Sequence, residues 1–150
     1  MVYRGCDLPE GLWYDVDRDL WVRFEEDGTA TLGMTDPAQT RCGRMVIVRF
    51  KAAGRRVPRG QSLATIESAK WVGPFPAALS GVIVGRNEAA FQRDILIANK
   101  DPYGEGWLVR LRHDRLEEER GALVTGAEAL ARYRARIDAN GINCMRCAEG

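Results

Sequence analysis

The sequence predicts a mainly β protein made of antiparallel sheets, with one longer helix near its C-terminal end. Most of the chain consists of short apolar segments bounded by Gly, Pro and Asp, a pattern typical of antiparallel strands. Asp27-Gly28 separates two of these segments and indicates a hairpin, because Gly supplies the positive φ that such a turn requires. A long stretch with helical spacing of apolar residues occurs beyond residue 124.

Six strands and one short helix are expected before that point. The strands are residues 20–24, 29–32, 45–50, 63–67, 82–84 and 107–111. The short helix begins within residues 35–39, where Pro37 lies in the first turn and its missing N–H is not needed. These elements place a β domain in residues 1–124.

Residues 125–139 are predicted to form an amphipathic helix. Thr125-Gly126-Ala127-Glu128 has the form of a capping box, and Asn140-Gly141 ends the pattern. The apolar stripe consists of Leu130, Tyr133 and Ile137. Because the stripe is narrow, we expect the helix to lie against the β core and to direct three arginines to solvent, Arg132, Arg134 and Arg136. The organisation is then a β domain (1–124), a helix packed on it (125–140) and a flexible tail (141–150) that contains two cysteines.

Size and charge limit the classes of protein that the chain can represent. At 150 residues and 16.7 kDa it fits one domain, and 29% charged residues with a net charge of +1 disfavour disorder, coiled coils and basic nucleic-acid binders. No apolar run reaches the roughly 18 residues of a membrane span, and the N-terminal residues lack the apolar core of a signal peptide. We therefore expect a cytoplasmic monomer that binds neither membrane nor nucleic acid.

The four cysteines are expected to be reduced, because cytoplasmic thiols seldom form structural disulfides. Cys6 and Cys42 are isolated in the sequence, whereas Cys144 and Cys147 form a CxxC near the C-terminus. A structural zinc site would need a second pair or a nearby histidine, and the sequence has neither at a suitable spacing. No metal site is therefore predicted.

Lys70 lies almost midway in the sequence between two glycines that are expected to form turns. Gly60 precedes it by ten residues and Gly81 follows it by eleven. A strand from Gly60 to Glu67 and a segment returning to Gly81 would leave Ser68-Ala69-Lys70 as a turn with the amine in water. A lone turn lysine is most often only a solvated charge, so its interpretation depends on the rest of the sequence.

Several segments accompany Glu67-Ser68-Ala69-Lys70 along the chain. They are residues 33–39, Ser80-Gly81-Val82, Asn87-Glu88-Ala89 and Asn99-Lys100-Asp101-Pro102-Tyr103-Gly104-Glu105-Gly106-Trp107-Leu108. Together these residues resemble the lipoyl-domain superfamily and, within it, the H protein of the glycine cleavage system, in which a Glu-Ser-x-Lys turn carries a lipoylated lysine. The resemblance covers roughly residues 12–135.

The resemblance implies a barrel-sandwich hybrid of two antiparallel sheets and a lipoyl carrier that has no catalytic residues of its own. Lipoate would be joined to Lys70 by an amide, and Glu67, Ser68 and Gly81 would present the turn to a lipoate ligase or to lipoate-assembly enzymes. The five-membered disulfide ring of lipoate cannot reach the dihedral angle near 90° that open disulfides prefer, so it is strained and ready for thiol attack. The carrier would supply delivery, and its partners the chemistry.

Three features depart from the glycine-cleavage pattern. Trp71-Val72-Gly73-Pro74 follows the lysine, Asp19-Leu20-Trp21 replaces His-Glu-Trp, and the Cys144–Cys147 pair ends the chain. The combination is similar to the lipoate-binding proteins that work with the heterodisulfide-reductase-like complex of sulfur-oxidising prokaryotes. We therefore expect a shuttle for sulfur-bound intermediates or electrons, reoxidised by lipoamide dehydrogenase, with Cys144 and Cys147 available for thiol exchange.

Three alternatives remain at this point. An H protein of the glycine cleavage system would carry an aminomethyl group on the reduced arm. A biotinyl carrier would share the fold, but it typically displays its lysine between two methionines, whereas Ala69 and Trp71 flank Lys70. A purely structural module would carry no modification.

Overall fold

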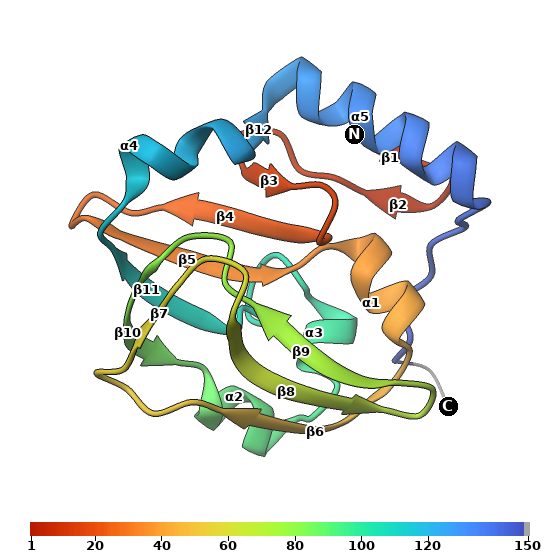
Figure 1. Ribbon diagram of the computed structural model, residues 1–150. Coiled ribbons are helices and arrows are strands. Elements are labelled where there is room, and N and C mark those ends of the chain that lie inside the picture. Colours follow the sequence, from red (N-terminus) through yellow and green to blue (C-terminus); the bar gives the residue numbers. More distant parts are fainter. Residues whose placement is uncertain (149–150) are drawn as a thin grey trace.

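Two antiparallel sheets enclose the main apolar core of the protein. The computed structural model, which describes residues 1–148, confirms a mainly β fold with short helices and a C-terminal helix (Figure 1). The seven-stranded sheet has the order β12 (Val124–Thr125), β3 (Trp13–Asp15), β4 (Leu20–Phe24), β5 (Thr29–Met34), β11 (Val109–His113), β10 (Gly81–Arg86) and β7 (Arg56–Val57). The three-stranded sheet has the order β6 (Met45–Phe50), β8 (Ser62–Ser68) and β9 (Val72–Pro76). A separate two-stranded sheet pairs β1 (Val2–Tyr3) with β2 (Cys6–Asp7).

The helices lie around the sheets and connect their strands. They are α1 (Asp36–Cys42), α2 (Glu88–Arg93), α3 (Ile97–Lys100), α4 (Leu116–Glu119) with a 3₁₀ turn at Arg120–Ala122, and α5 (Gly126–Asn140). Figure 1 shows α5 over the β3 edge of the large sheet, on the side opposite the three-stranded sheet. The predicted start of α1 is confirmed, since the Thr35 side chain accepts a hydrogen bond from the Ala38 N–H at 3.2 Å.

Two apolar clusters hold these layers together. The first lies between the two sheets and includes Leu32, Ile66 and Phe75, each no more than 1% exposed. The second lies under α5 and includes Tyr14 and Trp21 of the sheet. The helix contributes Ala129, Tyr133 and Ile137 to this second cluster. The C-terminal helix therefore packs on the β core through these buried apolar side chains, as expected.

The predicted strands agree with the structure within a few residues. Residues 20–24 and 45–50 coincide with β4 and β6, and the other four predicted strands overlap β5, β8, β10 and β11. β9 was expected only as a return segment. Its sequence, Val72-Gly73-Pro74-Phe75-Pro76, has two prolines, which are tolerated at a sheet edge, and β9 is an edge strand of its sheet.

Two details of the predicted C-terminal helix are wrong. Thr125 makes no capping bond to α5, because its hydroxyl instead donates to the Leu12 carbonyl at 2.7 Å. Arg136 does not extend freely into solvent, since its guanidinium lies 3.2 Å from the carboxylate of buried Asp19. Both side chains find partners outside the helix, which helical spacing cannot indicate.

The cysteine expectation is wrong for Cys6 and Cys144, which form a disulfide across a sequence separation of 138. Cys42 and Cys147 are free thiols, as expected. The disulfide fixes one point of the predicted flexible tail, and the Cys144 N–H also donates to the Arg4 carbonyl at 3.1 Å. Residues 149 and 150 of that predicted tail lie outside the described residues.

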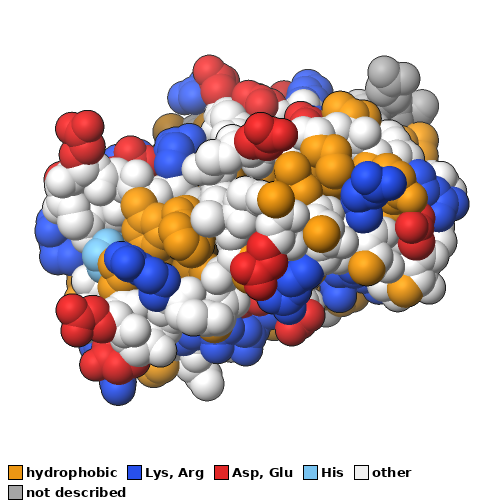
Figure 2. All heavy atoms as spheres, turned by 90° about the horizontal axis from the view of Figure 1, so that it is seen from above, with side chains coloured by type: hydrophobic (Ala, Val, Ile, Leu, Met, Phe, Trp, Pro, Cys, Tyr) orange, Lys and Arg blue, Asp and Glu red, His pale blue; other side chains and the backbone are white. Residues whose placement is uncertain are grey.

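The surface carries charges of both signs. Seen from the side of α5, acidic and basic side chains are interspersed rather than gathered by sign (Figure 2). Within residues 1–148, none of the helices combines the length and the apolar character needed to cross a bilayer.

Loss of the disulfide should destabilise the protein. We expect Cys6→Ser to lower the free energy of unfolding by about 2–4 kcal/mol, because a cross-link between distant residues restricts the unfolded chain. Urea unfolding of wild type and variant under oxidising conditions measures the difference. A reductant should bring wild type to the variant's midpoint and leave the variant unchanged; a wild-type midpoint that the reductant does not move contradicts this expectation.

Candidate functional site

Lys70 lies at the free tip of the hairpin between β8 and β9. The strands pair up to Glu67 and Val72, and the Ser68 N–H donates to the Trp71 carbonyl at 2.8 Å to close the turn. Lys70 is exposed. The tip therefore offers an amine to the solvent while its two flanks belong to a regular hairpin.

The turn is supported by the chain segment that follows α1. The Ser68 hydroxyl donates to the Cys42 carbonyl at 2.6 Å and accepts the Lys70 N–H at 3.2 Å. The Ala69 N–H donates to the Arg44 carbonyl at 3.0 Å. Ser68 and Ala69 are thereby both bonded to the segment after α1, so the backbone that leads to Lys70 is anchored.

Gly43 provides room for the lysine side chain. It has a φ of +81° and a ψ of −167°, a conformation that is essentially restricted to glycine. A Cβ added at Gly43 would lie 2.6 Å from Cε of Lys70 and 3.5 Å from its Nζ. The aliphatic part of Lys70 thus lies across the bare glycine. Gly43 therefore fits a lysine that bears an acyl group, because a side chain at position 43 would obstruct the side chain of Lys70.

Asn99 holds the supporting segment in place from the interior. Its side chain is fully buried, accepts the Met45 N–H at 3.1 Å and donates to the Gly43 carbonyl at 2.9 Å. It also donates to Gln39 of α1 at 3.2 Å. One amide therefore satisfies backbone groups on both sides of Arg44, the residue that binds the turn.

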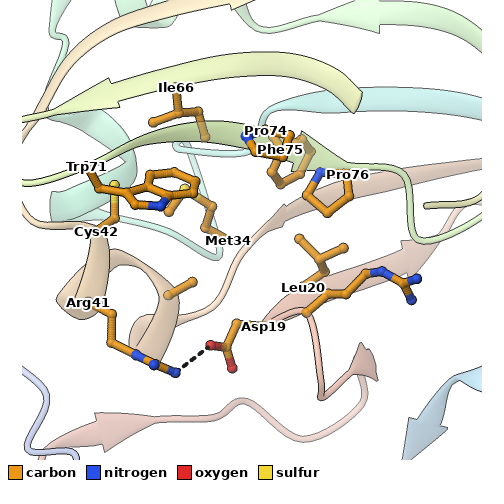
Figure 3. Close-up of a pocket in the computed structure, with 12 residues that line it drawn as sticks. Asp19, Leu20, Met34, Arg41, Cys42, Ile66, Trp71, Pro74, Phe75 and Pro76 are labelled. Carbon is orange, nitrogen blue, oxygen red and sulfur yellow. Dashed lines mark ion pairs between the residues drawn. The ribbon is translucent and has the colours of Figure 1, made fainter. Parts of the chain in front are cut away.

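A cavity of about 320 Å³ opens beside the turn. Trp71 forms part of its wall, and a Cβ added at Gly73 would lie 2.1 Å from the indole ring, so the ring lies flat across that glycine. Figure 3 shows Trp71, Cys42 and Met34 at one end of the cavity and Asp19 with Arg41 at another. The apolar part of the wall also includes Leu20, Ala38, Ile66, Pro74, Phe75 and Pro76.

The polar end of the cavity is held by an ion-pair network. Asp19 lies 3.8 Å from Arg41 and 3.2 Å from Arg136. Burial raises the pKa of the Asp19 carboxyl above its usual value, and Arg136 and Arg41 oppose this shift. At the other end, burial raises the pKa of the Cys42 thiol, which the Ser68 hydroxyl partly offsets. The Cys42 thiol is therefore mainly protonated near neutral pH.

The structure separates the residues that the sequence grouped around the lysine. Ser68 lies at the turn, and Glu67 precedes it with a long contact of 3.9 Å to Arg49. Gly81 lies away from the turn, because it begins β10 in the other sheet, where an added Cβ would clash with the Arg112 carbonyl. Gly81 is also buried, and its part in recognition by a modifying enzyme stays a prediction.

Three features of the site escaped the sequence analysis. Gly43 and Asn99 contact the turn or its support only through tertiary structure, and no local pattern marks them. The dependence of Trp71 on Gly73 could have been found, since a large residue two positions from a glycine on one strand face can lie across it.

Comparisons with known proteins agree with this geometry. The family model described as glycine cleavage H-protein matches residues 12–135. "Glycine cleavage system H protein 2" of Aquifex aeolicus is 44% identical over 142 residues, which are 95% of this chain and 88% of that protein. "Probable glycine cleavage system H protein 2" of Sulfolobus acidocaldarius is 38% identical over 148 residues, covering 97% of this chain and 98% of that protein. The crystal structure of a glycine cleavage system H protein from Mycobacterium marinum has a TM-score of 0.70 and 30% identity, and covers 84% of this chain and 98% of its own.

Removal of the Asn99 amide should loosen the lysine turn. We expect Asn99→Ala to lower the free energy of unfolding by about 2–4 kcal/mol, because two buried backbone groups lose their partners. Urea unfolding measures this loss, and faster amide hydrogen exchange at Ala69 reports the turn itself. The matched control is Asn140→Ala at an exposed position, where a change within about 0.5 kcal/mol is expected. Equal effects of the two substitutions would refute the role of Asn99.

Proposed function

Because this chain belongs to the glycine cleavage H-protein family, we propose that it carries a lipoyl group on Lys70 and delivers this group to partner enzymes. Proteins of the family carry lipoate covalently on a lysine and have no catalytic activity of their own. The observation that carries the proposal is the placement of Lys70 at an exposed hairpin tip, across the bare backbone of Gly43, within the matched residues.

The residues around Lys70 suit a group that must be both attached and mobile. The anchored backbone at Ser68 and Ala69 presents the lysine at a fixed place, which an attaching enzyme requires. The exposed side chain leaves the arm free to visit other proteins. When bound, the lipoyl group supplies a strained disulfide that opens to two thiols, and the charge of the amine is lost in the amide.

Two pathways could use such a carrier, and the comparisons favour the glycine cleavage system over sulfur oxidation. The matched family and the relatives described above are named for glycine cleavage. We therefore propose that the reduced arm holds an aminomethyl group. The proposed partners are lipoate-attaching enzymes and the enzymes of glycine cleavage, including lipoamide dehydrogenase, in the cytoplasm.

Sulfur oxidation with a heterodisulfide-reductase-like complex is the second candidate. The observation in its favour is the surface beside the lysine, where the partly exposed Trp71 ring covers Gly73. A bulky indole at this position changes the face that glycine decarboxylase would meet. The sulfur-rich C-terminal segment is the other feature that a sulfur carrier could use.

Attachment at Lys70 can be tested against the other lysines of the chain, Lys51 and Lys100. Intact mass and peptide mapping of protein from its native host should find one lipoyl group, located on Lys70. Lys70→Arg should abolish the added mass, because a guanidinium is not acylated, while Lys51→Arg and Lys100→Arg should retain it. A lipoyl group found on either of these two residues, or on none, would disprove the proposed attachment site.

The pathway can be decided with the lipoylated protein. Incubation with glycine decarboxylase and glycine labelled with ¹⁴C at its α-carbon, which remains after loss of CO₂, should transfer label to the wild-type arm and leave Lys70→Arg unlabelled. Trp71→Ala should change the rate of loading if this face meets the decarboxylase. Absence of label on wild type, with normal loading of a glycine cleavage H protein in parallel, would transfer support to sulfur oxidation.

A further inference from the structure

Cysteine residues lie at the end of α1 and in two segments that contact this helix, β2 and the residues after α5. Cys42 is the last residue of α1, and the C-terminal segment passes beside the same helix (Figure 1). Cys6, Cys144 and Cys147 all lie outside residues 12–135, the segment that the family model matches. Of the four cysteines, Cys42 alone therefore lies within the part of the chain that the family model matches.

Gln39 and Thr40 hold the C-terminal segment against α1. Buried Gln39 donates to the Met145 carbonyl at 2.6 Å and accepts the Cys147 N–H at 3.1 Å. The Cys147 thiol lies 3.8 Å from the Thr40 carbonyl. These contacts place Cys147 against α1, the helix that ends next to Gly43 and the Lys70 side chain.

Cys42 lies between the lysine and Cys147. On one side of Cys42, the Cys147 thiol lies 3.8 Å from the carbonyl of Thr40, two residues earlier in α1. The Lys70 side chain already lies across Gly43, the next residue. A lipoyl group would add an acyl chain and a dithiolane ring to this side chain and so extend its reach from the position beside Gly43.

Exposure distinguishes the two free thiols. Cys42 is only 6% exposed and mainly protonated, so it is a poor nucleophile. Cys147 is partly exposed. It lies three residues from Cys144, a spacing at which cysteines form CxxC disulfides. Cys6 is fully buried, so a nucleophile must reach the disulfide at Cys144, which is partly exposed.

We propose that Cys144 and Cys147 form a thiol–disulfide exchange site that links the lipoyl arm on Lys70 to the Cys6–Cys144 disulfide. The inference rests on the proposed function, because it requires a dithiol on Lys70. It adds an activity to the carrier: the protein itself can accept the two electrons of its reduced arm.

The exchange has three steps. The Cys147 thiolate attacks Sγ of Cys144, a Cys144–Cys147 disulfide forms, and Cys6 leaves and takes up a proton. One thiolate of the reduced arm then attacks Sγ of Cys147, forming a mixed disulfide and releasing Cys144 as a thiol. The second arm thiol attacks the arm sulfur of that mixed disulfide, closes the lipoyl ring and releases Cys147.

The overall change balances without another reagent. Two electrons and two protons pass from the dihydrolipoyl arm to Cys6 and Cys144, and Cys147 returns to its starting state. The neutral Cys6 thiol is left among apolar side chains, where the protonated form is favoured. The reverse sequence lets an oxidised arm restore the disulfide, so the direction depends on which pair is the stronger oxidant.

The test follows opening of the disulfide in the lipoylated full-length protein. Lipoamide dehydrogenase and NADH reduce the arm, samples are quenched with an alkylating agent, and peptide mass spectrometry counts thiols at Cys6 and Cys144. We expect Cys147→Ser to open the disulfide roughly tenfold more slowly than wild type. Cys42→Ser, the matched control, should open it at the wild-type rate. Equal urea midpoints of the oxidised proteins would exclude a general loosening.

A second experiment separates this inference from the proposed function. Unlipoylated protein is treated with free dihydrolipoamide, and the same dependence on Cys147 is expected. A lipoylated protein whose disulfide opens equally fast in wild type and Cys147→Ser overturns the exchange site and leaves the carrier function intact. Protein from the native host that carries no lipoyl group overturns the link to Lys70, whatever dihydrolipoamide does.

Discussion

The contact between the lysine turn and residues 42–45 is the constraint on which the site depends. A hairpin tip alone is a mobile element, since its central residues have no ladder partners. Here Ser68 and Ala69 bond to the backbone of Cys42 and Arg44, and Asn99 fixes that backbone from within the core. The same hydrogen bonds therefore connect the interior of the protein to the one amine that must be reached from outside.

This constraint explains why glycine occupies position 43. The backbone there turns out of α1 in a conformation that other residues avoid, and the Lys70 side chain lies where a Cβ would be. One residue thus meets two requirements, one from helix termination and one from the modified lysine. An alanine would strain the backbone and displace the lysine chain together.

Local patterns in the sequence predicted the strands and helices, whereas the geometry of the lysine site depends on tertiary contacts that these patterns do not show. Strands β4 and β6 could be predicted because their apolar residues and bounding turns lie within a few positions of each other. The lysine turn followed from the family resemblance and from Gly60 near the base of the hairpin. Asn99 could not be assigned its role, because its partners Gly43 and Met45 are more than fifty positions away. For Gly81, the near-equal spacing of Gly60 and Gly81 about Lys70 suggested that both glycines flank one hairpin. The chain enters the other sheet at Gly81 instead.

The disulfide illustrates the same limit with a different consequence. Compartment and spacing argued for free thiols, yet the fold brings β2 and the residues after α5 together beside α1. Once they meet, the cross-link closes almost the entire chain and keeps Cys147 beside the helix that supports Lys70. Cys147 lies three residues from Cys144 and is a free thiol. Under the proposed exchange, this partly exposed thiol, held beside the helix that supports Lys70, gives the arm access to the disulfide.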